Sequence, residues 1–228
     1  PVGLLTHPDN REFKNSLTEM VKAYLYKKGE YDPKSYFTPS PSHRLDTNTS
    51  GIVVIAKNQD ALKKINSEFR ERTTKKIYLG LFYGRLSDNI LITSEIDVKE
   101  NRENRVKIID PKIIGIIPNK ESFLQNNTNL SCTFIKPLKV SASATLGEIE
   151  LWTGKKHQIR AQLNSINHSL LGDQKYFTTA SVSFSQMFGI KNYHLHSYKL
   201  KIENYNEFVA PIPDNFKNIV YDIFKEKI

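Results

Sequence analysis

Residues 76–83, Lys-Ile-Tyr-Leu-Gly-Leu-Phe-Tyr, are the stretch that decides the fold. Apolar and aromatic side chains dominate it, which is typical of a β-strand. Because side chains alternate along a strand, Ile77, Leu79 and Leu81 would share one face, and Tyr78 would lie on the other. A tyrosine in that place usually packs on a second core layer, or it can offer its ring to a nucleic-acid base.

A helix is predicted directly before this strand, and several strands are predicted after it. Leu62, Ile65 and Phe69 recur at helical spacing and predict a helix that ends about three residues later. Residues 90–152 alternate less regularly, as β-structure does, and an Asn-rich loop is expected near 119–129.

The remaining patterns add helices and strands on either side. The expected elements are a helix carrying Phe13, Leu17, Val21 and Leu25, a loop at 31–42, a strand at 52–56, a helix carrying Ile159, Leu163 and Ile166, a turn at Gly172-Asp173, a strand at 193–202 and a helix within 209–228. Strands interspersed with few helices, without a repeat or linker, favour one α+β domain over residues 1–228. Its central sheet would be mixed, largely antiparallel and flanked by helices and loops.

Composition points to a nucleic-acid partner. The 228 residues have a formal net charge of +9, which favours a polyanion, and nucleic acid before an anionic membrane. No apolar run approaches the ~20 residues of a membrane span, and no signal-peptide pattern is present. We therefore expect a cytoplasmic, monomeric protein without a membrane partner.

Two further features concern the chain start and the single cysteine. The chain begins at Pro1 as if a loop were entered from upstream, which predicts a truncated N-terminus and leaves room for an upstream RNA-binding domain. Cys132 cannot form an internal disulfide, and it lies in an apolar stretch. We expect it to be a small buried side chain rather than a nucleophile.

The sequence has no pattern that predicts a metal or cofactor site. It has no Gly-rich phosphate loop and no Cys/His metal spacing. His194 and His196 would share one face of a strand, but no third ligand lies nearby, so a packed or hydrogen-bonded role is favoured. The lack of clustered carboxylates also disfavours a metal-dependent nuclease.

Two segments carry candidate functional residues. Asp46 lies where a polar loop meets a strand, with Arg44 on the same side if the segment is extended; the pattern alone favours a turn-capping Asp beside a solvated Arg. Lys155 and Lys156 precede the helix that contains Arg160. They would form a phosphate site together with backbone N–H groups, or only a solvated basic face.

The order of several motifs resembles the RluA-type RNA pseudouridine synthase family. The motifs are His43-Arg44-Leu45-Asp46-Thr47-Asn48-Thr49-Ser50-Gly51 with Ala56-Lys57, then Lys76-Ile77-Tyr78-Leu79, Thr153–Arg160, His168 with Leu171-Gly172-Asp173, and Leu195-His196. The opening, residues 1–8, also resembles the family's Pro-x-Gly-Leu-x-x-His-Pro. The matches follow the family order from residue 1 to about 200.

This resemblance implies an isomerase that converts uridine to pseudouridine in RNA without a cofactor or metal. Asp46 would attack the ribose or the ring, or abstract a sugar proton, and these alternatives stay open. Arg160 would pair with Asp46, and Tyr78 would stack on the uracil and could assist the final proton removal, so the implied catalytic residues are Asp46, Tyr78 and Arg160. The implied RNA- or base-binding residues are Arg44, which would fill the space of the flipped base, Leu195, which would pack beneath the base, and Lys76, Lys155, Lys156 and His157.

The chain departs from the family pattern at a few positions. Lys155 replaces the usual Arg, Ser169 stands where Pro is frequent, and Ser197 stands where Ala is frequent. Residues 101–129 do not match closely. Ribosomal RNA of the large subunit is the expected target and transfer RNA the alternative. A non-catalytic RNA-binding or ribosome-assembly protein on the same fold is the competing hypothesis.

Overall fold

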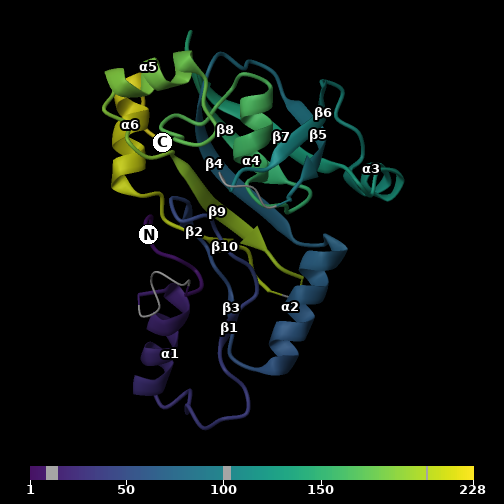
Figure 1. Cartoon of the computed structure of the whole chain (residues 1–228), viewed down its shortest axis with the longest axis vertical. Coiled ribbons are helices and arrows are strands. Elements are labelled where there is room, and N and C mark those ends of the chain that lie inside the picture. The colour runs from purple at the N-terminus through teal and green to yellow at the C-terminus, as the bar shows by residue number, and fades with distance from the viewer. Residues whose placement is uncertain (9–14, 100–103, 204) are drawn as a thin grey trace.

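A mixed eight-stranded sheet forms the centre of the computed structural model, which describes residues 1–8, 15–99, 104–203 and 205–228 (Figure 1). Its order is β10-β9-β4-β8-β7-β5-β6, and β2 pairs with β9. The β2–β9 pair is parallel and the other printed pairs of this sheet are antiparallel. The strands are β2 Ser50–Gly51, β4 Lys75–Tyr83, β5 Ile90–Asp97, β6 Lys107–Ile114, β7 Ser131–Val140, β8 Ala144–Leu151, β9 Leu195–Lys201 and β10 Phe208–Val209. The predicted α+β fold with a largely antiparallel sheet is confirmed.

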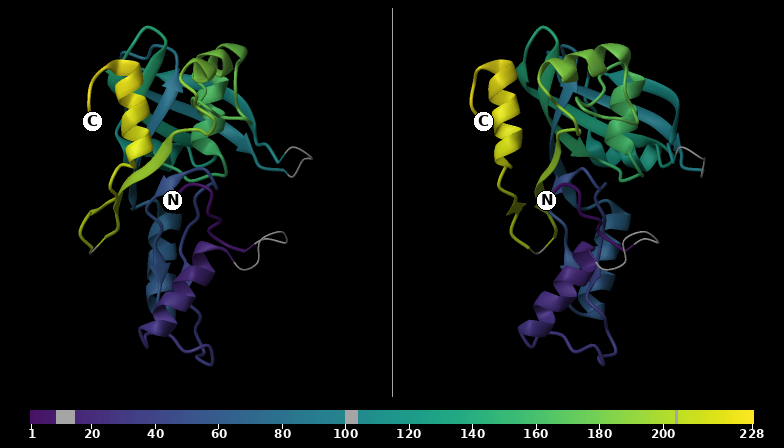
Figure 2. Two further views of the ribbon diagram at one scale, coloured as in Figure 1. Left: turned by 90° about the vertical axis from the view of Figure 1, so that its left-hand side faces the viewer. Right: turned by 60° about the vertical axis from the view of Figure 1, so that its left-hand side comes forward.

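Helices pack on both faces of this sheet, as Figures 1 and 2 show. The helices are α1 Leu17–Lys27, α2 Gln59–Glu71, α3 Lys120–Asn126, α4 Gln158–Ser165, α5 Thr179–Met187 and α6 Asp214–Phe224. Ile159 and Leu163 of α4 join Tyr78 in one apolar cluster. Leu79 and Leu81 join α6 in another cluster. The alternation predicted for the central strand is therefore confirmed, and Tyr78 faces α4.

The strand expected at 52–56 is wrong in its extent. The chain instead forms β2, leaves the sheet, and forms β3, Ile55–Ala56, which pairs with β1, Ser40–Pro41, in a separate two-stranded sheet. Residues 52–54 connect the two sheets: the Ile52 N–H still donates to the Ser197 carbonyl oxygen, and the Val54 carbonyl oxygen accepts from the Ser42 N–H, but no single ladder runs through the segment. Figure 1 shows β1 and β3 between α1 and α2, below the large sheet.

Several other boundaries also differ from the sequence expectation. The Asn-rich loop contains α3, because the Asn119 side chain accepts a hydrogen bond from the Ser122 backbone N–H and caps a helix there. No prediction covered α5, which begins with a capping box between Thr178 and Ser181. The helix predicted within residues 209–228 is confirmed and runs from Asp214 to Phe224, after a proline-containing segment. Phe13 of the first expected helix lies outside the described residues.

Two of the composition-based expectations can be checked against the structure. Cys132 is fully buried, and burial raises the pKa of its thiol to about 11, which fits the predicted packing role. Among the helices of the described residues, none is both long and apolar enough to cross a membrane.

Gly51 holds the loop that contains Asp46 against β9. Its φ is +114°, and a Cβ at this position would lie 2.2 Å from the Ser197 carbonyl oxygen. Gly51 faces Ser197 in the parallel pair, and the next residue continues the contact through a 3.0 Å hydrogen bond from the Ile52 N–H to the same oxygen. Only glycine lets the two backbones approach so closely.

Gly51→Ala should lower the free energy of unfolding by about 2 kcal/mol or more, because it adds backbone strain to a steric clash. Urea denaturation measures this change. The matched control is Gly115→Ala, since nothing lies within 4 Å of a Cβ at that position. Equal stability of the two variants would show that the close approach at Gly51 does not constrain the fold.

Candidate active site

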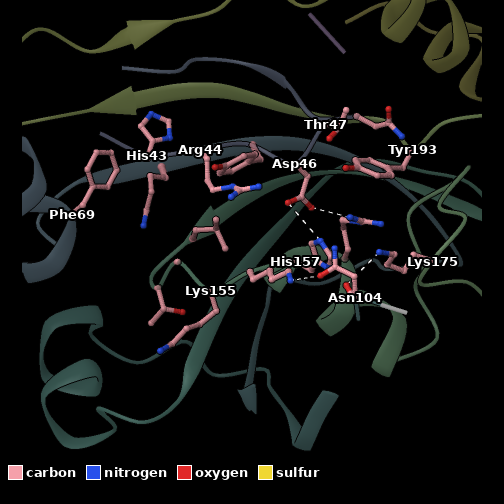
Figure 3. Close-up of a pocket in the computed structure, with 18 of the residues that line it drawn as sticks. His43, Arg44, Asp46, Thr47, Phe69, Asn104, Lys155, His157, Lys175 and Tyr193 are labelled. Carbon is pink, nitrogen blue, oxygen red and sulfur yellow. Dashed lines mark hydrogen bonds and ion pairs between the residues drawn. The ribbon is translucent and has the colours of Figure 1, made fainter. Parts of the chain in front are cut away.

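A pocket of about 1170 Å³ contains most of the residues that the sequence analysis singled out (Figure 3). It opens where the loop after β1, the end of α2, the start of β4 and the turn before α4 meet. Of the predicted site residues, the lining includes Asp46, Tyr78, Arg160, Arg44, Lys76, Lys155, Lys156 and His157. Leu195 is not part of this lining; it is buried in the apolar cluster that includes Tyr78.

Asp46 and Arg160 form an ion pair at the centre of the pocket. Arg160 Nη1 donates a hydrogen bond of 2.9 Å to Asp46 Oδ2. A turn positions the carboxylate, because the Thr49 N–H donates to the Asp46 carbonyl oxygen. The Arg160 side chain is 8% exposed, so it is not part of a solvated basic face. The pair joins a loop and a helix that are 114 residues apart in sequence.

Asp173 holds the other side of the same guanidinium group. Arg160 Nε donates to Asp173 Oδ2 at 2.7 Å, and Nη2 donates to Oδ1 at 3.0 Å. Asp173 Oδ1 also accepts bonds from the backbone N–H groups of Lys175 and Tyr176. Burial alone would lower the pKa of Arg160, but the bonds and charge of Asp173 raise it above its usual value, helped by Tyr193 and Asp46. Arg160 is therefore charged when it meets Asp46.

Two aromatic rings restrict the Arg160 guanidinium further. Its Cζ lies 4.4 Å from the ring centroid of Tyr193 and 5.2 Å from that of Tyr176. Both rings are buried, so these cation–π contacts are shielded from water. The orientation of Arg160 is thus set by a bidentate carboxylate and two aromatic rings, and its remaining nitrogen, Nη1, points at Asp46.

His157 lies against the second oxygen of Asp46. Its Nε2 is 3.9 Å from Asp46 Oδ1, and its Nδ1 is 2.9 Å from the Tyr176 hydroxyl oxygen. Burial lowers the pKa of His157 to about 4; the charge of Asp46 opposes this shift, and Arg160 with two nearby lysines adds to it. The imidazole is therefore neutral at physiological pH and leaves Arg160 as the cation that pairs with Asp46.

Tyr78 contributes a neutral phenol to the pocket wall. Burial raises its pKa to about 12; the charge of Asp46 adds to the shift, and a hydrogen bond with Ser197 opposes it. The hydroxyl stays protonated at neutral pH. Tyr78 thus belongs to the core and to the pocket wall at once, and its contact with a base stays a prediction.

Exposed cations line the rim of the pocket. Arg44, Lys155 and Lys156 are exposed, and Lys156 Nζ donates a hydrogen bond to Asn104. The two lysines precede α4, and the backbone N–H of Lys155 already donates to Gln158 Oε1. The phosphate site predicted as one alternative from the sequence would therefore depend on the lysine side chains rather than on a free N–H of Lys155.

Comparison with known proteins identifies the family to which this arrangement belongs. A family model described as RNA pseudouridylate synthase matches residues 1–165.

The chain belongs to the RNA pseudouridylate synthase family.

Similar proteins extend the match over the whole chain. An uncharacterised RNA pseudouridine synthase of Mycoplasma genitalium is 28% identical over 228 residues, which are 100% of this chain and 66% of that protein. A protein of Borreliella burgdorferi named ribosomal large subunit pseudouridine synthase D is 24% identical and covers 99% of this chain and 64% of its own length. The chain therefore spans slightly less than two thirds of each of these relatives.

A solved structure supports the fold. Human RNA pseudouridylate synthase domain containing 4 superposes with a TM-score of 0.73 and 21% identity, over 97% of this chain and 86% of that one. The resemblance inferred from the ordered motifs is confirmed at the level of the family and the fold. The roles of the individual site residues stay predictions.

In this member of the RNA pseudouridylate synthase family, three residues that surround Arg160 are absent from the site predicted from the sequence: Asp173, Tyr176 and Tyr193. At Asp173 the sequence predicts only a turn within a matched motif. The signal for Asp173 was its place in a matched motif, but nothing in the sequence pairs it with Arg160. No signal distinguished the two tyrosines from the other nine in the chain.

His194 and His196 each have a hydrogen-bond partner, as the sequence favoured. His196 Nδ1 lies 2.8 Å from the Ser50 hydroxyl oxygen, and His194 Nδ1 lies 3.1 Å from the Asn192 carbonyl oxygen. The described part of the chain has no group of three or more His, Cys, Asp or Glu residues that could hold a metal ion.

Asp173→Asn should lower the free energy of unfolding by about 3 kcal/mol, because it removes the buried counter-charge of Arg160. Urea denaturation at neutral pH measures the loss. Asp214→Asn is the control: Asp214 also pairs with a cation, Lys217, but its side chain is 91% exposed. A variant at Asp173 that is as stable as the control would contradict a structural role for the buried pair.

Proposed function

We propose that this chain is an RNA pseudouridine synthase that isomerises particular uridines in structured RNA, with large-subunit ribosomal RNA as its target and Asp46 as its catalytic carboxylate. The arrangement of Asp46 carries this proposal. Arg160 holds Oδ2, whereas Oδ1 accepts no hydrogen bond from any described residue and lines the pocket beside the neutral His157. An ionised, oriented carboxylate with one available oxygen can act as a nucleophile or as a base.

The proposed reaction needs only groups that the pocket contains. The bond from N1 of uracil to C1′ of the ribose breaks, the uracil turns, and C5 forms the new bond to C1′. C5 then loses its proton and N1 gains one, so no atom is added or removed overall. Asp46 would act on the ribose or the ring during the first step, with Arg160 holding its orientation through the later ones.

The neighbouring side chains fit a flipped uridine. Tyr78 places a ring and a protonated hydroxyl next to Asp46, which suits stacking and hydrogen bonding rather than proton abstraction in the resting state. Arg44 is exposed at the pocket entrance, where it could replace a base that leaves its stack. Leu195 would support the base only indirectly, because it lies in the same apolar cluster as Tyr78 and not in the pocket lining.

The choice of RNA rests on charge and on a relative. A net charge of +9 and the lysine-rich rim favour a polyanion. The Borreliella burgdorferi relative is named for the large ribosomal subunit. We extend that target class to this chain, and a transfer RNA target is the alternative outcome of the experiment below.

Asp46→Asn should reduce pseudouridine formation by roughly a thousand-fold or more, because it removes the charge of the reacting group. RNA affinity should stay within a few-fold, since binding depends on lysine and arginine contacts. The assay uses unmodified transcripts of ribosomal and transfer RNA and maps pseudouridine chemically after incubation.

The same assay separates the competing hypotheses. Conversion confined to transfer RNA would replace ribosomal RNA by transfer RNA as the proposed target. RNA binding without any conversion would favour a non-catalytic RNA-binding protein. Substantial turnover by the Asn variant would remove Asp46 from the mechanism.

Arg160→Lys should decrease kcat far more than affinity, because one ammonium group cannot bridge Asp46 and Asp173 as the planar fork does.

Replacing Lys155 and Lys156 together by Ala should decrease affinity far more than kcat. It should weaken binding and lower the salt dependence by about one to two units of slope, with kcat largely kept.

The control for the lysine pair is Lys63→Ala with Lys64→Ala, an exposed pair on α2 that does not line the pocket. Single-turnover kinetics at saturating RNA, together with affinity at several salt concentrations, distinguish the variants. If both site variants changed kcat equally, the division between positioning and binding residues would be wrong.

A further inference from the structure

The pocket extends well beyond the surroundings of Asp46. Figure 3 shows Phe69 and His43 at one end, Tyr193 and Lys175 at the other, and Asp46 between them. Its volume of about 1170 Å³ exceeds the upper end of the ~300–1,000 Å³ of pockets that bury one small ligand. A single flipped uridine beside Asp46 therefore leaves the end near Phe69 unfilled.

Lys76 lies at this second end with an unbalanced positive charge. It is the second residue of β4 and lines the pocket, and no described residue accepts a hydrogen bond from its ammonium group. Its Nζ lies 5.9 Å from the ring centroid of Phe69, and a Cβ on Gly154 would lie 3.4 Å from it. The ammonium group is thus enclosed between an aromatic ring and the turn before α4.

The charges around Lys76 do not neutralise it. Arg72 and Lys120 repel its positive charge, and Glu150 attracts it. Glu150 already pairs with Lys120 at 2.9 Å. Burial, with Lys120 and Arg72 next, lowers the pKa of Lys76 to about 8. A partly buried cation among like charges is stabilised by an anion that enters the pocket.

His43 does not supply a further charge here. Burial, and secondly the charge of Lys76, lower its pKa to about 4, so the ring is neutral at physiological pH. Its Nε2 accepts a bond from the Val54 N–H, which places the remaining ring proton on Nδ1. Its ring centroid lies 5.0 Å from that of Phe69. The end of the pocket thus combines two cations, Lys76 and Arg72, with an aromatic wall.

We infer that this end of the pocket binds one phosphate group of the RNA backbone next to the target uridine, with Lys76 and Arg72 as its counter-charges. The inference rests on the proposed function, because it takes the uridine beside Asp46 as given. Arg72 is held by a 3.2 Å bond from Nη2 to the Thr128 carbonyl oxygen, which leaves further guanidinium donors for the phosphate. Phosphate is the anion that an RNA strand presents at every nucleotide.

A charge-deletion cycle tests this site. The probe is an RNA hairpin that carries the uridine mapped in the conversion assay, with single phosphates near it replaced in turn by neutral methylphosphonate. Affinity is measured for the wild type, Lys76→Met and the control Lys75→Met. Lys75 is exposed and absent from the pocket lining, and its neighbouring place in β4 directs it to the opposite face.

One replacement within two nucleotides of the uridine should weaken binding about ten-fold or more in the wild type and in Lys75→Met, and by much less in Lys76→Met. Arg72→Gln should show the same loss of sensitivity and is the second variant if Lys76→Met does not fold. Equal effects in all proteins, or coupling only at a distant phosphate, would overturn the inference. Failure of the wild type to convert any RNA would instead refute the proposed function.

The pH dependence of affinity is an independent readout. Because the protonated Lys76 binds the phosphate, affinity of the wild type should fall as the pH rises above about 8, towards ten-fold per unit, and Lys76→Met should lack this decrease. The variant retains Arg72, Lys120, Glu150 and His43, which interact electrostatically with Lys76, and also Lys155 of the adjoining turn and the buried Cys132 near Arg72. Parallel pH profiles of the two proteins would argue against Lys76 as the phosphate ligand.

Discussion

Two carboxylates share the guanidinium group of Arg160, and the arrangement of the site depends on this contact. Asp173 accepts hydrogen bonds from Nε and Nη2, and Asp46 accepts one from Nη1. Because Asp173 is buried and fixed by two backbone N–H groups, it determines where the guanidinium group lies. Asp46 is therefore oriented by an Arg160 side chain that is itself held in place. The contact also joins three segments that meet only in the folded chain.

The backbone supports this contact from the other side of Asp46. Gly51 allows the end of the loop to pair in parallel with β9, and the Ser50 hydroxyl oxygen lies 2.8 Å from Nδ1 of His196. The loop is consequently held at both of its ends, by the sheet and by Arg160. This double attachment explains how an irregular segment can hold a carboxylate in a defined place, as functional loops on rigid scaffolds do.

The electrostatics of the pocket differ along its length. Around Asp46, Arg160 pairs with two carboxylates, the adjacent histidine is neutral, and Lys156 and Lys175 lie nearby. Around Lys76, cations outnumber carboxylates. A negative group of the proposed substrate would therefore be attracted to the end around Lys76. This division is suited to a strand of RNA, in which an uncharged base and charged phosphates alternate.

The sequence by itself determined the fold class, the main strands and helices, and the family, because alternation, helical spacing and ordered motifs are local properties. It also singled out Asp46, Tyr78 and Arg160. It did not locate α3 and α5 or the break between β2 and β3, since capping and strand pairing override weak local patterns there. Only the tertiary structure brought Asp173, Tyr176 and Tyr193 around Arg160 and placed Lys76 where cations outnumber carboxylates. Those features depend on distances between residues far apart in the chain, and on burial, which no local pattern encodes.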